Sequence, residues 1–257
     1  MPRRPSEPDW RHWLDRWDEQ QESFNPDREA RFEAMFDILQ AALPARFTAL
    51  DLGCGPGSLT ARLLRRFPRA RSVAVDYDPV ALRVGQGALR SLGNRITWVD
   101  ANLGSPGWTR ALPARRFDAA VSTTALHWLD GATLGRLYAD LAQALPRGGV
   151  LLNGDILPWG PKRRELRKIV EDVRRIKFRG KSLQSEWAGW TRWWRDIERV
   201  PTLRAEFAER KRRFPTPHGD SEPPPIDVHE RAMRLAGFRE IAVTWQRFEN
   251  RILLGIR

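Results

Sequence analysis

Five short apolar segments alternate with stretches of helical spacing between residues 47 and 155, and this alternation constrains the fold most. It is typical of βαβ units, in which successive strands lie parallel. Strands of a parallel sheet are covered on both faces, so they are continuously apolar. The segments are FTALDL (47–52), RSVAVD (71–76), RITWVD (95–100), FDAAVS (117–122) and GVLLNGD (149–155), with predicted helices near 58–67, 79–91 and 131–145.

Two further apolar segments close the chain and are predicted to pair with each other. FREIAVTWQRF (238–248) and NRILLGIR (250–257) are separated by a two-residue turn around Glu249-Asn250, which favours an antiparallel hairpin. A helix capped by Asp227 and stopped by Gly237 precedes them. The expected fold is therefore α/β, a doubly wound, mostly parallel seven-stranded sheet with a C-terminal antiparallel hairpin.

Two regions lie outside the alternation. Near the N-terminus Trp10, Trp13 and Trp17 share one helical face, and Asn25-Pro26 is the predicted start of a second helix. After the fifth strand the chain becomes basic, rich in tryptophan and helical, until a proline-rich linker. The predicted division is a helical cap (1–46), a ligand-binding core (47–155), a helical insertion that covers the substrate (156–225) and a closing helix and hairpin (226–257).

Composition restricts the available chemistry. Cys54 is the only cysteine, which excludes an intrachain disulfide, a cysteine-based zinc cluster and a three-cysteine iron–sulfur site. No apolar segment approaches the roughly 20 residues that a membrane-spanning helix needs. The polar, proline-broken N-terminus lacks the apolar region of a secretory signal. We therefore expect a cytoplasmic protein with no membrane span.

A glycine-rich motif follows the first strand, in ALDLGCGPGSL (49–59). Glycines 53, 55 and 57 allow the backbone to turn sharply and to approach a ligand without interfering Cβ atoms. The spacing differs from the dinucleotide motif G-x-G-x-x-G, because position 58 is serine. No Gly-Lys-Ser/Thr follows, so the motif is also not a phosphate loop.

Acidic residues end the first three strands or lie beside their ends. Asp76 ends the second strand, nineteen residues after Gly57, where a carboxylate suits the two hydroxyls of a ribose. Asp100 ends the third strand, where it could accept from an adenine amino group. Together with Asp51, these acids converge on the crevice where open α/β sheets bind ligands. The pattern predicts a site for an adenosine without a diphosphate.

The combination of LDLGCGPG, VAVDYDP, VDANL and STTALHWLD resembles the class I S-adenosylmethionine-dependent methyltransferases. It is most similar to the small-molecule branch that includes trans-aconitate methyltransferase-like and related "type 11" enzymes. The resemblance covers residues 27–155 strongly and 227–257 in topology, and it implies a Rossmann-like sheet. It says little about the insertion.

The resemblance also implies a cofactor, S-adenosylmethionine, with S-adenosylhomocysteine as its product. Asp51 and Gly53 would lie against the methionine moiety, Gly55 and Gly57 beneath the cofactor, Asp76 at the ribose, Asp100 and Ala101 at the adenine, and Ser122 beside the methionine. The complete predicted cofactor set is Asp51, Gly53, Cys54, Gly55, Gly57, Asp76, Tyr77, Asp100, Ala101, Asn102 and Ser122.

His127 is the candidate catalytic residue, because it follows the fourth strand and would lie beside the transferable methyl group. Histidine is the natural base near neutral pH, so it could deprotonate an acceptor hydroxyl. His127 could equally pack or cap this turn, and a carboxylate acceptor would need no base. His127 and Trp128 are therefore also candidate substrate contacts.

Several methyltransferase chemistries lack their residues here. The Asn/Asp-Pro-Pro-aromatic motif of amino-methylating nucleic-acid enzymes is replaced by STTALHW. Cytosine C5 methylation needs a nucleophilic cysteine after the fourth strand, whereas Cys54 lies in the glycine loop and is expected to be inert. A catechol-type metal site needs a carboxylate cluster, and Asp155 has no convincing second acidic partner. We therefore predict no metal.

The insertion permits several interpretations. Trp187, Trp190 and Trp194 share a helical face that could line an apolar or aromatic acceptor, or could pack the insertion onto the core. Residues 161–214 contain 18 basic and 8 acidic residues, most of the excess that gives the chain its net charge of +12. This basic surface could be solvated, could attract an anionic small molecule, or could contact RNA or a membrane surface.

The expected function is transfer of a methyl group from S-adenosylmethionine to a small organic acceptor, at a hydroxyl or carboxylate oxygen, by in-line displacement. One alternative is a methyltransferase that acts on RNA through the basic insertion. Another is a protein that binds S-adenosylmethionine without turnover.

Overall fold

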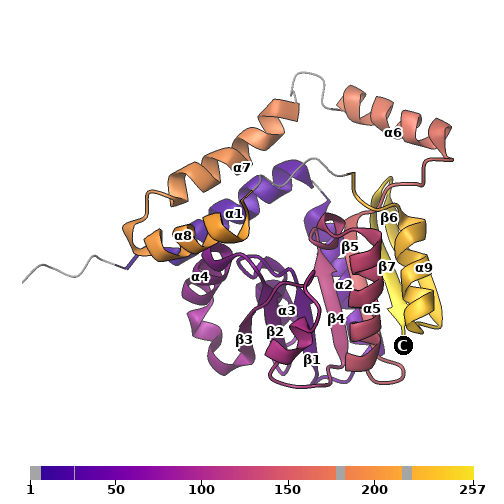
Figure 1. Cartoon of the computed structure of the whole chain (residues 1–257), viewed down its shortest axis with the longest axis horizontal. Coiled ribbons are helices and arrows are strands. Elements are labelled where there is room, and N and C mark those ends of the chain that lie inside the picture. Colours follow the sequence, from indigo (N-terminus) through magenta and orange to yellow (C-terminus); the bar gives the residue numbers. More distant parts are fainter. Residues whose placement is uncertain (1–6, 26, 178–182, 216–221) are drawn as a thin grey trace, which may run out of the picture.

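The computed structural model describes residues 7–25, 27–177, 183–215 and 222–257 (Figure 1). The strands are β1 (Thr48–Leu52), β2 (Arg71–Asp76), β3 (Ile96–Asp100), β4 (Ala119–Thr123), β5 (Val150–Ile156), β6 (Glu240–Arg247) and β7 (Asn250–Ile256). The helices are α1 (Trp10–Phe24), α2 (Arg28–Ala42), α3 (Ser58–Arg66), α4 (Pro79–Ala88), α5 (Gly131–Ala144), α6 (Arg164–Lys177), α7 (Leu183–Ile197), α8 (Arg204–Arg213) and α9 (Ile226–Ala236). Short 3₁₀ helices are η1 (Arg90–Arg95), η2 (Trp108–Ala111), η3 (Leu126–Trp128) and η4 (Pro201–Leu203).

The strands form one seven-stranded sheet in the order β3-β2-β1-β4-β5-β7-β6. The pairs from β3 to β5 are parallel, whereas β7 is antiparallel to both β5 and β6. This confirms the predicted fold class. The strand order reverses between β1 and β4, so the crevice that binds ligands in open α/β sheets lies at their carboxyl ends.

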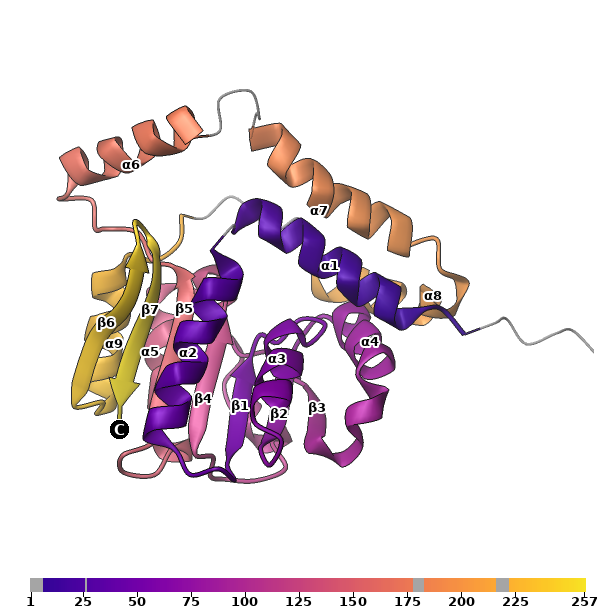
Figure 2. The ribbon, with the colours of Figure 1, turned by 180° about the vertical axis from the view of Figure 1, so that it is seen from behind.

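Helices cover both faces of the sheet (Figures 1 and 2). On one face lie α2, α3 and α4, and the stripe predicted for α2 is buried there: Phe32, Met35, Phe36 and Leu39 are each at most 1% exposed. On the other face lie α5 and α9, and α5 buries Leu134, Leu137 and Leu141 against the sheet. Burial on both faces explains why the parallel strands are continuously apolar.

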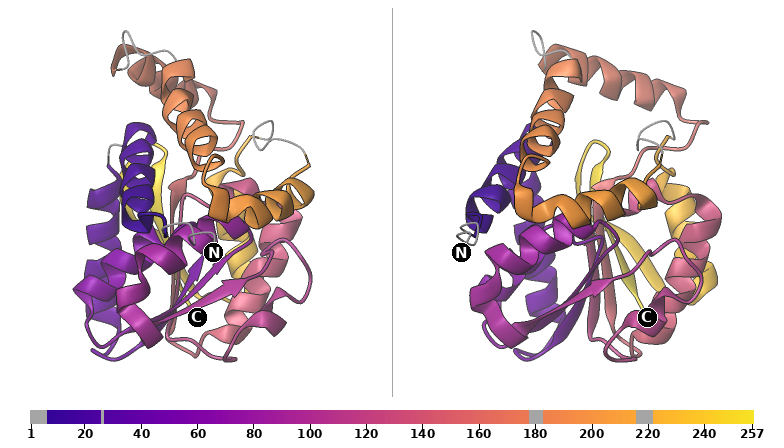
Figure 3. Two further views of the ribbon diagram at one scale, coloured as in Figure 1. Left: turned by 90° about the vertical axis from the view of Figure 1, so that its left-hand side faces the viewer. Right: turned by 60° about the vertical axis from the view of Figure 1, so that its left-hand side comes forward.

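Helices α1, α6, α7 and α8 lie above the edge at which the parallel strands end (Figures 1 and 2). Figure 3 shows α8 against α4, and α7 leading upward from it toward α6. The insertion and the N-terminal helix therefore both lie on the side of the molecule where the crevice opens. None of the helices among the described residues combines the length and the apolar character needed to span a bilayer.

The prediction that α2 starts at Asn25-Pro26, with Asn25 as its N-cap residue, is wrong. The helix begins at Arg28 with Asp27 as its N-cap residue, and Pro26 lies outside the described residues. Asn25 instead ends α1, because its backbone N–H donates to the carbonyl of Gln21.

Two other boundaries shift by a residue. Helix α9 begins at Ile226, so Asp227 lies in the first turn and the predicted Asp227 cap is wrong, while Gly237 ends the helix at φ +94° as predicted. The hairpin turn consists of Phe248 and Glu249, because the antiparallel ladder retains Asn250 in β7.

Candidate active site

The glycine-rich loop between β1 and α3 is held tightly against two neighbouring strands. The backbone N–H groups of Gly53 and Cys54 donate to the carbonyl of Val75 in β2. Gly53 has φ +67°, and a Cβ atom there would lie 2.4 Å from the Cβ of Ala125, which follows β4. Only glycine fits this position, and the loop therefore contacts the turn that carries His127.

Asp76 organises the loop from the end of β2. Its carboxylate accepts from the backbone N–H groups of Gly55 (2.6 Å), Tyr77 (2.7 Å) and Asp78 (2.8 Å). The predicted ribose acceptor is thus fixed in place by three donors, directly beside the glycines.

Asp51 and Ser122 lie at the ends of the two central strands and are fully buried. The Asp51 Oδ2 atom accepts from Thr60 Oγ1 (2.6 Å), whereas Oδ1 is buried with no hydrogen-bond partner among the described residues. An orphaned carboxylate oxygen is costly, so a ligand with a donor group would stabilise it. Ser122 Oγ donates to the Leu52 carbonyl (2.8 Å), which commits the hydroxyl to linking β4 with β1.

The remaining predicted cofactor residues lie around these acids. Cys54 is buried, and burial raises the pKa of its thiol well above the usual value, so the thiol is inert. Ala101 N–H donates to the Asp76 carbonyl, and Asn102 Oδ1 accepts from the backbone of Gly104.

Asp100 is the direct register partner of Asp76 in the neighbouring strand. Its carboxylate is already engaged, because Arg213 of α8 forms an ion pair with it at 2.6 Å. The sequence patterns did not predict this contact between the insertion and the cofactor residues.

His127 and Asp155 form a pair across the carboxyl ends of β4 and β5. His127 Nδ1 lies 2.8 Å from Asp155 Oδ1, and the His127 backbone N–H donates to Asp155 Oδ2. The Asp155 side chain is completely buried, whereas 16% of the His127 side chain is exposed.

The protonation of this pair follows from the surroundings of Asp155. Burial alone would raise the pKa of Asp155, but the interactions with His127, the charge of Arg31 and the N–H of Ile156 outweigh burial and hold the pKa below its usual value. Asp155 is therefore an ionised acceptor, so Nδ1 of His127 carries the hydrogen. In a neutral imidazole with its hydrogen on Nδ1, Nε2 has the lone pair that a general base needs.

Arg31 of α2 supports the turn between β4 and His127. It is completely buried and donates to the hydroxyls of Thr123 and Thr124 (both 2.6 Å) and to Asn250 Oδ1 (2.8 Å). Burial lowers the pKa of Arg31 to about 10, against the opposing charge of Asp155. Thr124 has φ +52°, a strained value that these hydrogen bonds stabilise. The sequence of α2 did not predict this role of Arg31, because it shows only a basic residue beside an apolar stripe.

The predicted tryptophan contacts have different surroundings. Trp190 and Trp194 are half-buried and pack with Trp17 of α1 at centroid distances of 5.3 and 6.3 Å. Trp128 is 42% exposed, and its ring centroid lies 4.6 Å from that of His127. Trp187 belongs to α7, but its side chain lies outside the described residues. Only Trp128 is therefore seen beside the His127–Asp155 pair.

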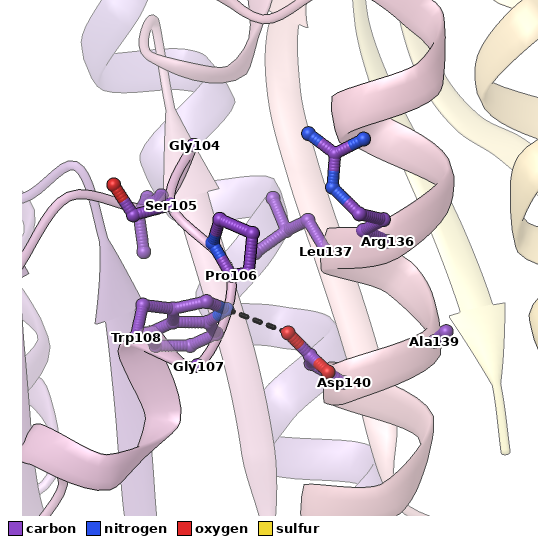
Figure 4. Close-up of a pocket in the computed structure, with 10 residues that line it drawn as sticks. Gly104, Ser105, Pro106, Gly107, Trp108, Arg136, Leu137, Ala139 and Asp140 are labelled. Carbon is purple, nitrogen blue, oxygen red and sulfur yellow. Dashed lines mark hydrogen bonds between the residues drawn. The ribbon is translucent and has the colours of Figure 1, made fainter.

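A small pocket lies between the loop after β3 and α5 (Figure 4). Trp108 Nε1 donates to Asp140 across its wall, and Arg136 lies nearby. None of the predicted site residues lines this pocket. Within the described residues, no three His, Cys, Asp or Glu side chains converge as they would around a metal ion.

The core of the chain is similar to a known protein family. Residues 49–149 match a protein family described as "Methyltransferase domain". Residues 49–149 therefore form a methyltransferase domain. The match confirms the methyltransferase resemblance stated from the sequence motifs, and S-adenosylmethionine is the cofactor expected from those motifs.

Several similar proteins are also methyltransferases, and each is longer than the segment that matches this chain. A trans-aconitate 2-methyltransferase of Azoarcus sp. (strain BH72) is 37% identical over 137 residues, which are 52% of this chain and 49% of the relative. Another, of Methylobacterium radiotolerans, is 35% identical over 50% of this chain and 47% of its own. The chain spans about half the length of these relatives. The fold is similar to that of CalO1, a methyltransferase in calicheamicin biosynthesis (TM-score 0.51, 17% identity, 85% of this chain and 52% of that one).

The methyltransferase domain fits its cofactor in three respects. A Cβ atom at Gly55 would meet only the ring of Trp17, at 3.6 Å, so the loop leaves space beside Asp76. Asp51 Oδ1 has no hydrogen-bond partner among the described residues, and Asp76 faces the loop as a fixed acceptor. A ligand with hydroxyl and ammonium donors would complete these acids.

The two buried acids predict a pH dependence of cofactor binding. Burial raises the pKa of Asp76 to about 6 and that of Asp51 to about 7. Hydroxyl and ammonium donors favour ionised carboxylates, so binding lowers both pKa values and releases protons. We expect full affinity above pH 7 and weaker binding as the pH falls through 6.

Calorimetric titration with S-adenosylhomocysteine, in two buffers of different ionisation enthalpy, measures this proton release. The Asp76→Asn variant should bind more weakly and release fewer protons near pH 6. An affinity that rises on acidification would contradict the prediction.

Proposed function

We propose that this protein transfers a methyl group from S-adenosylmethionine to a hydroxyl oxygen of a small organic acceptor. The observation that carries the proposal is the His127–Asp155 pair, with Nδ1 held by a buried carboxylate at 2.8 Å. A carboxylate acceptor is already ionised, so its methylation would not require a general base. The relatives named trans-aconitate 2-methyltransferase keep the carboxylate as the second candidate.

In this proposal the chain binds the cofactor, orients the acceptor and deprotonates the acceptor hydroxyl. S-adenosylmethionine supplies an electrophilic methyl group on a sulfonium. Asp51 would hold the ammonium group of S-adenosylmethionine, and Asp76 would hold its ribose hydroxyls. The glycine loop would lie beneath the cofactor. His127 Nε2 would accept the proton of the acceptor hydroxyl, and Asp155 would stabilise the imidazolium that forms. Positioning of the acceptor oxygen in line with the methyl group supplies the remaining advantage.

Trp128 is proposed as an acceptor contact, because its partly exposed ring lies beside His127. For Trp190 and Trp194 the contacts with Trp17 favour packing of α7 against α1. Several basic residues of the insertion are already paired, among them Arg210 with Asp78 and Lys211 with Glu198. These pairings weaken the proposal that the insertion binds RNA.

The test uses the purified chain with methyl-labelled S-adenosylmethionine and three acceptor samples. These are a panel of phenols and hydroxy acids, trans-aconitate, and a cell extract with or without nuclease treatment. Label on hydroxyl compounds supports the proposal, and label on trans-aconitate alone makes the acceptor a carboxylate. Label in large, nuclease-sensitive material would make it RNA. Binding of S-adenosylhomocysteine without transfer to any sample would contradict a catalytic role.

A further inference from the structure

The C-terminal end of α8 is joined to the carboxyl ends of β2 and β3 by one arginine. Arg213 donates from both terminal nitrogens to the two oxygens of Asp100, at 2.6 and 2.9 Å. The same guanidinium donates to the backbone carbonyl of Tyr77 at 2.8 Å. One side chain of the insertion therefore links both strands that end in the predicted adenosine residues.

The guanidinium is held on every side. It lies 4.6 Å from the ring centroid of Tyr77, and its Nε donates to Glu209 at 2.6 Å. The Arg213 side chain is 15% exposed, although Asp100 is 47% exposed. A bidentate pair of this kind fixes the plane of the carboxylate, which a solvated aspartate would not maintain.

A second arginine fixes the same helix to the core. Arg210 Nε lies 2.6 Å from Asp78 Oδ2, and its guanidinium stacks on Trp194 at 3.7 Å. Asp78 in turn accepts from the first backbone N–H groups of α4. Helix α8 is therefore anchored at two points along the cofactor side of the crevice.

Asp100 still has acceptor capacity in this arrangement. Each carboxylate oxygen has two lone pairs, and the bidentate arginine uses one on each oxygen. A lone pair remains on each for a further donor, such as the amino group of a purine. Asp100 is also the register partner of Asp76, so this acceptor lies beside the predicted ribose site.

We propose that Arg213 is a positioning residue for adenine recognition, which orients the carboxylate of Asp100 toward the purine amino group. This inference rests on the proposed cofactor site. It assigns the end of the insertion to the cofactor side of the crevice, in addition to any role over the acceptor.

The test compares the affinities of two ligands by calorimetry: S-adenosylhomocysteine and its 6-deamino analogue, in which hydrogen replaces the purine amino group. A hydrogen bond to a charged acceptor predicts that the natural ligand binds about ten- to hundredfold more tightly. Arg213→Gln should reduce this preference to within about threefold. Arg213→Lys, which retains charge but loses the bidentate geometry, should give an intermediate preference.

Lys211→Gln is the matched control, because Lys211 lies in the same helix, is exposed and pairs with Glu198 rather than with Glu209 or Asp100. It should retain the wild-type preference. An Arg213→Gln variant that weakens both ligands equally would show a merely structural role and overturn the inference. An unchanged preference would overturn it as well. Wild-type protein that binds neither ligand would instead reject the cofactor site itself.

Discussion

Replacing His127 by alanine should lower kcat about 10²–10⁴-fold, the usual range for loss of a general base. The affinity for S-adenosylhomocysteine should remain within about twofold, since His127 contacts the acceptor rather than the cofactor in the proposed arrangement. The measurement combines steady-state methyl transfer to the identified acceptor with calorimetric titration of the cofactor product. Unchanged turnover would reject His127 as the base.

Asp155 provides the companion variant. In Asp155→Asn the amide can donate to Nδ1, which would move the imidazole proton to Nε2 and remove the basic lone pair. We expect a loss of kcat comparable to that of His127→Ala, without an additive effect in the double variant. Additive losses would show that the two side chains act separately. Thermal unfolding of each variant controls for the buried position of Asp155.

Much of the cofactor side could be predicted, because it depends on local sequence. The glycines and the acid after each strand lie within a few residues of a strand end, and parallel strands bring their carboxyl ends to one edge. Gly53 and Asp76 therefore lie where the motif placed them, beside the same loop.

The rest depends on contacts between distant segments. His127 was a candidate, yet its partner Asp155 was considered only as a metal ligand, because the adjacency of β4 and β5 is a property of strand order. Arg31 and Arg213 act across 92 and 113 residues, and no local pattern specifies such pairings. The aromatic spacing in α7 pointed to the face of Trp190 and Trp194, whereas Trp193 is the most buried tryptophan among the described residues.

Trp193 connects α7 to α1, and its removal should be the most destabilising single change in the insertion. Only 1% of the residue is exposed, and its Nε1 donates to the Trp13 carbonyl at 3.1 Å. Its ring lies 4.9 Å from both Trp17 and Trp194. Truncation of a large buried aromatic residue costs about 3–5 kcal/mol, because the cavity is only partly refilled. We expect Trp193→Ala to lower the free energy of unfolding by about this amount in urea denaturation followed by circular dichroism.

Trp190→Ala is the matched control, because Trp190 lies in the same helix but is half-buried. Its loss of stability should be clearly smaller, since less apolar area returns to water. Hydrogen exchange should show faster exchange in α1 and α7 of the Trp193 variant, while β1 and β4 remain protected, if the cluster mainly joins these two helices. A Trp193→Ala variant as stable as the wild type would show that the aromatic cluster does not anchor α7. A Trp190→Ala variant that retains stability but loses acceptor affinity would indicate that Trp190 contacts the substrate.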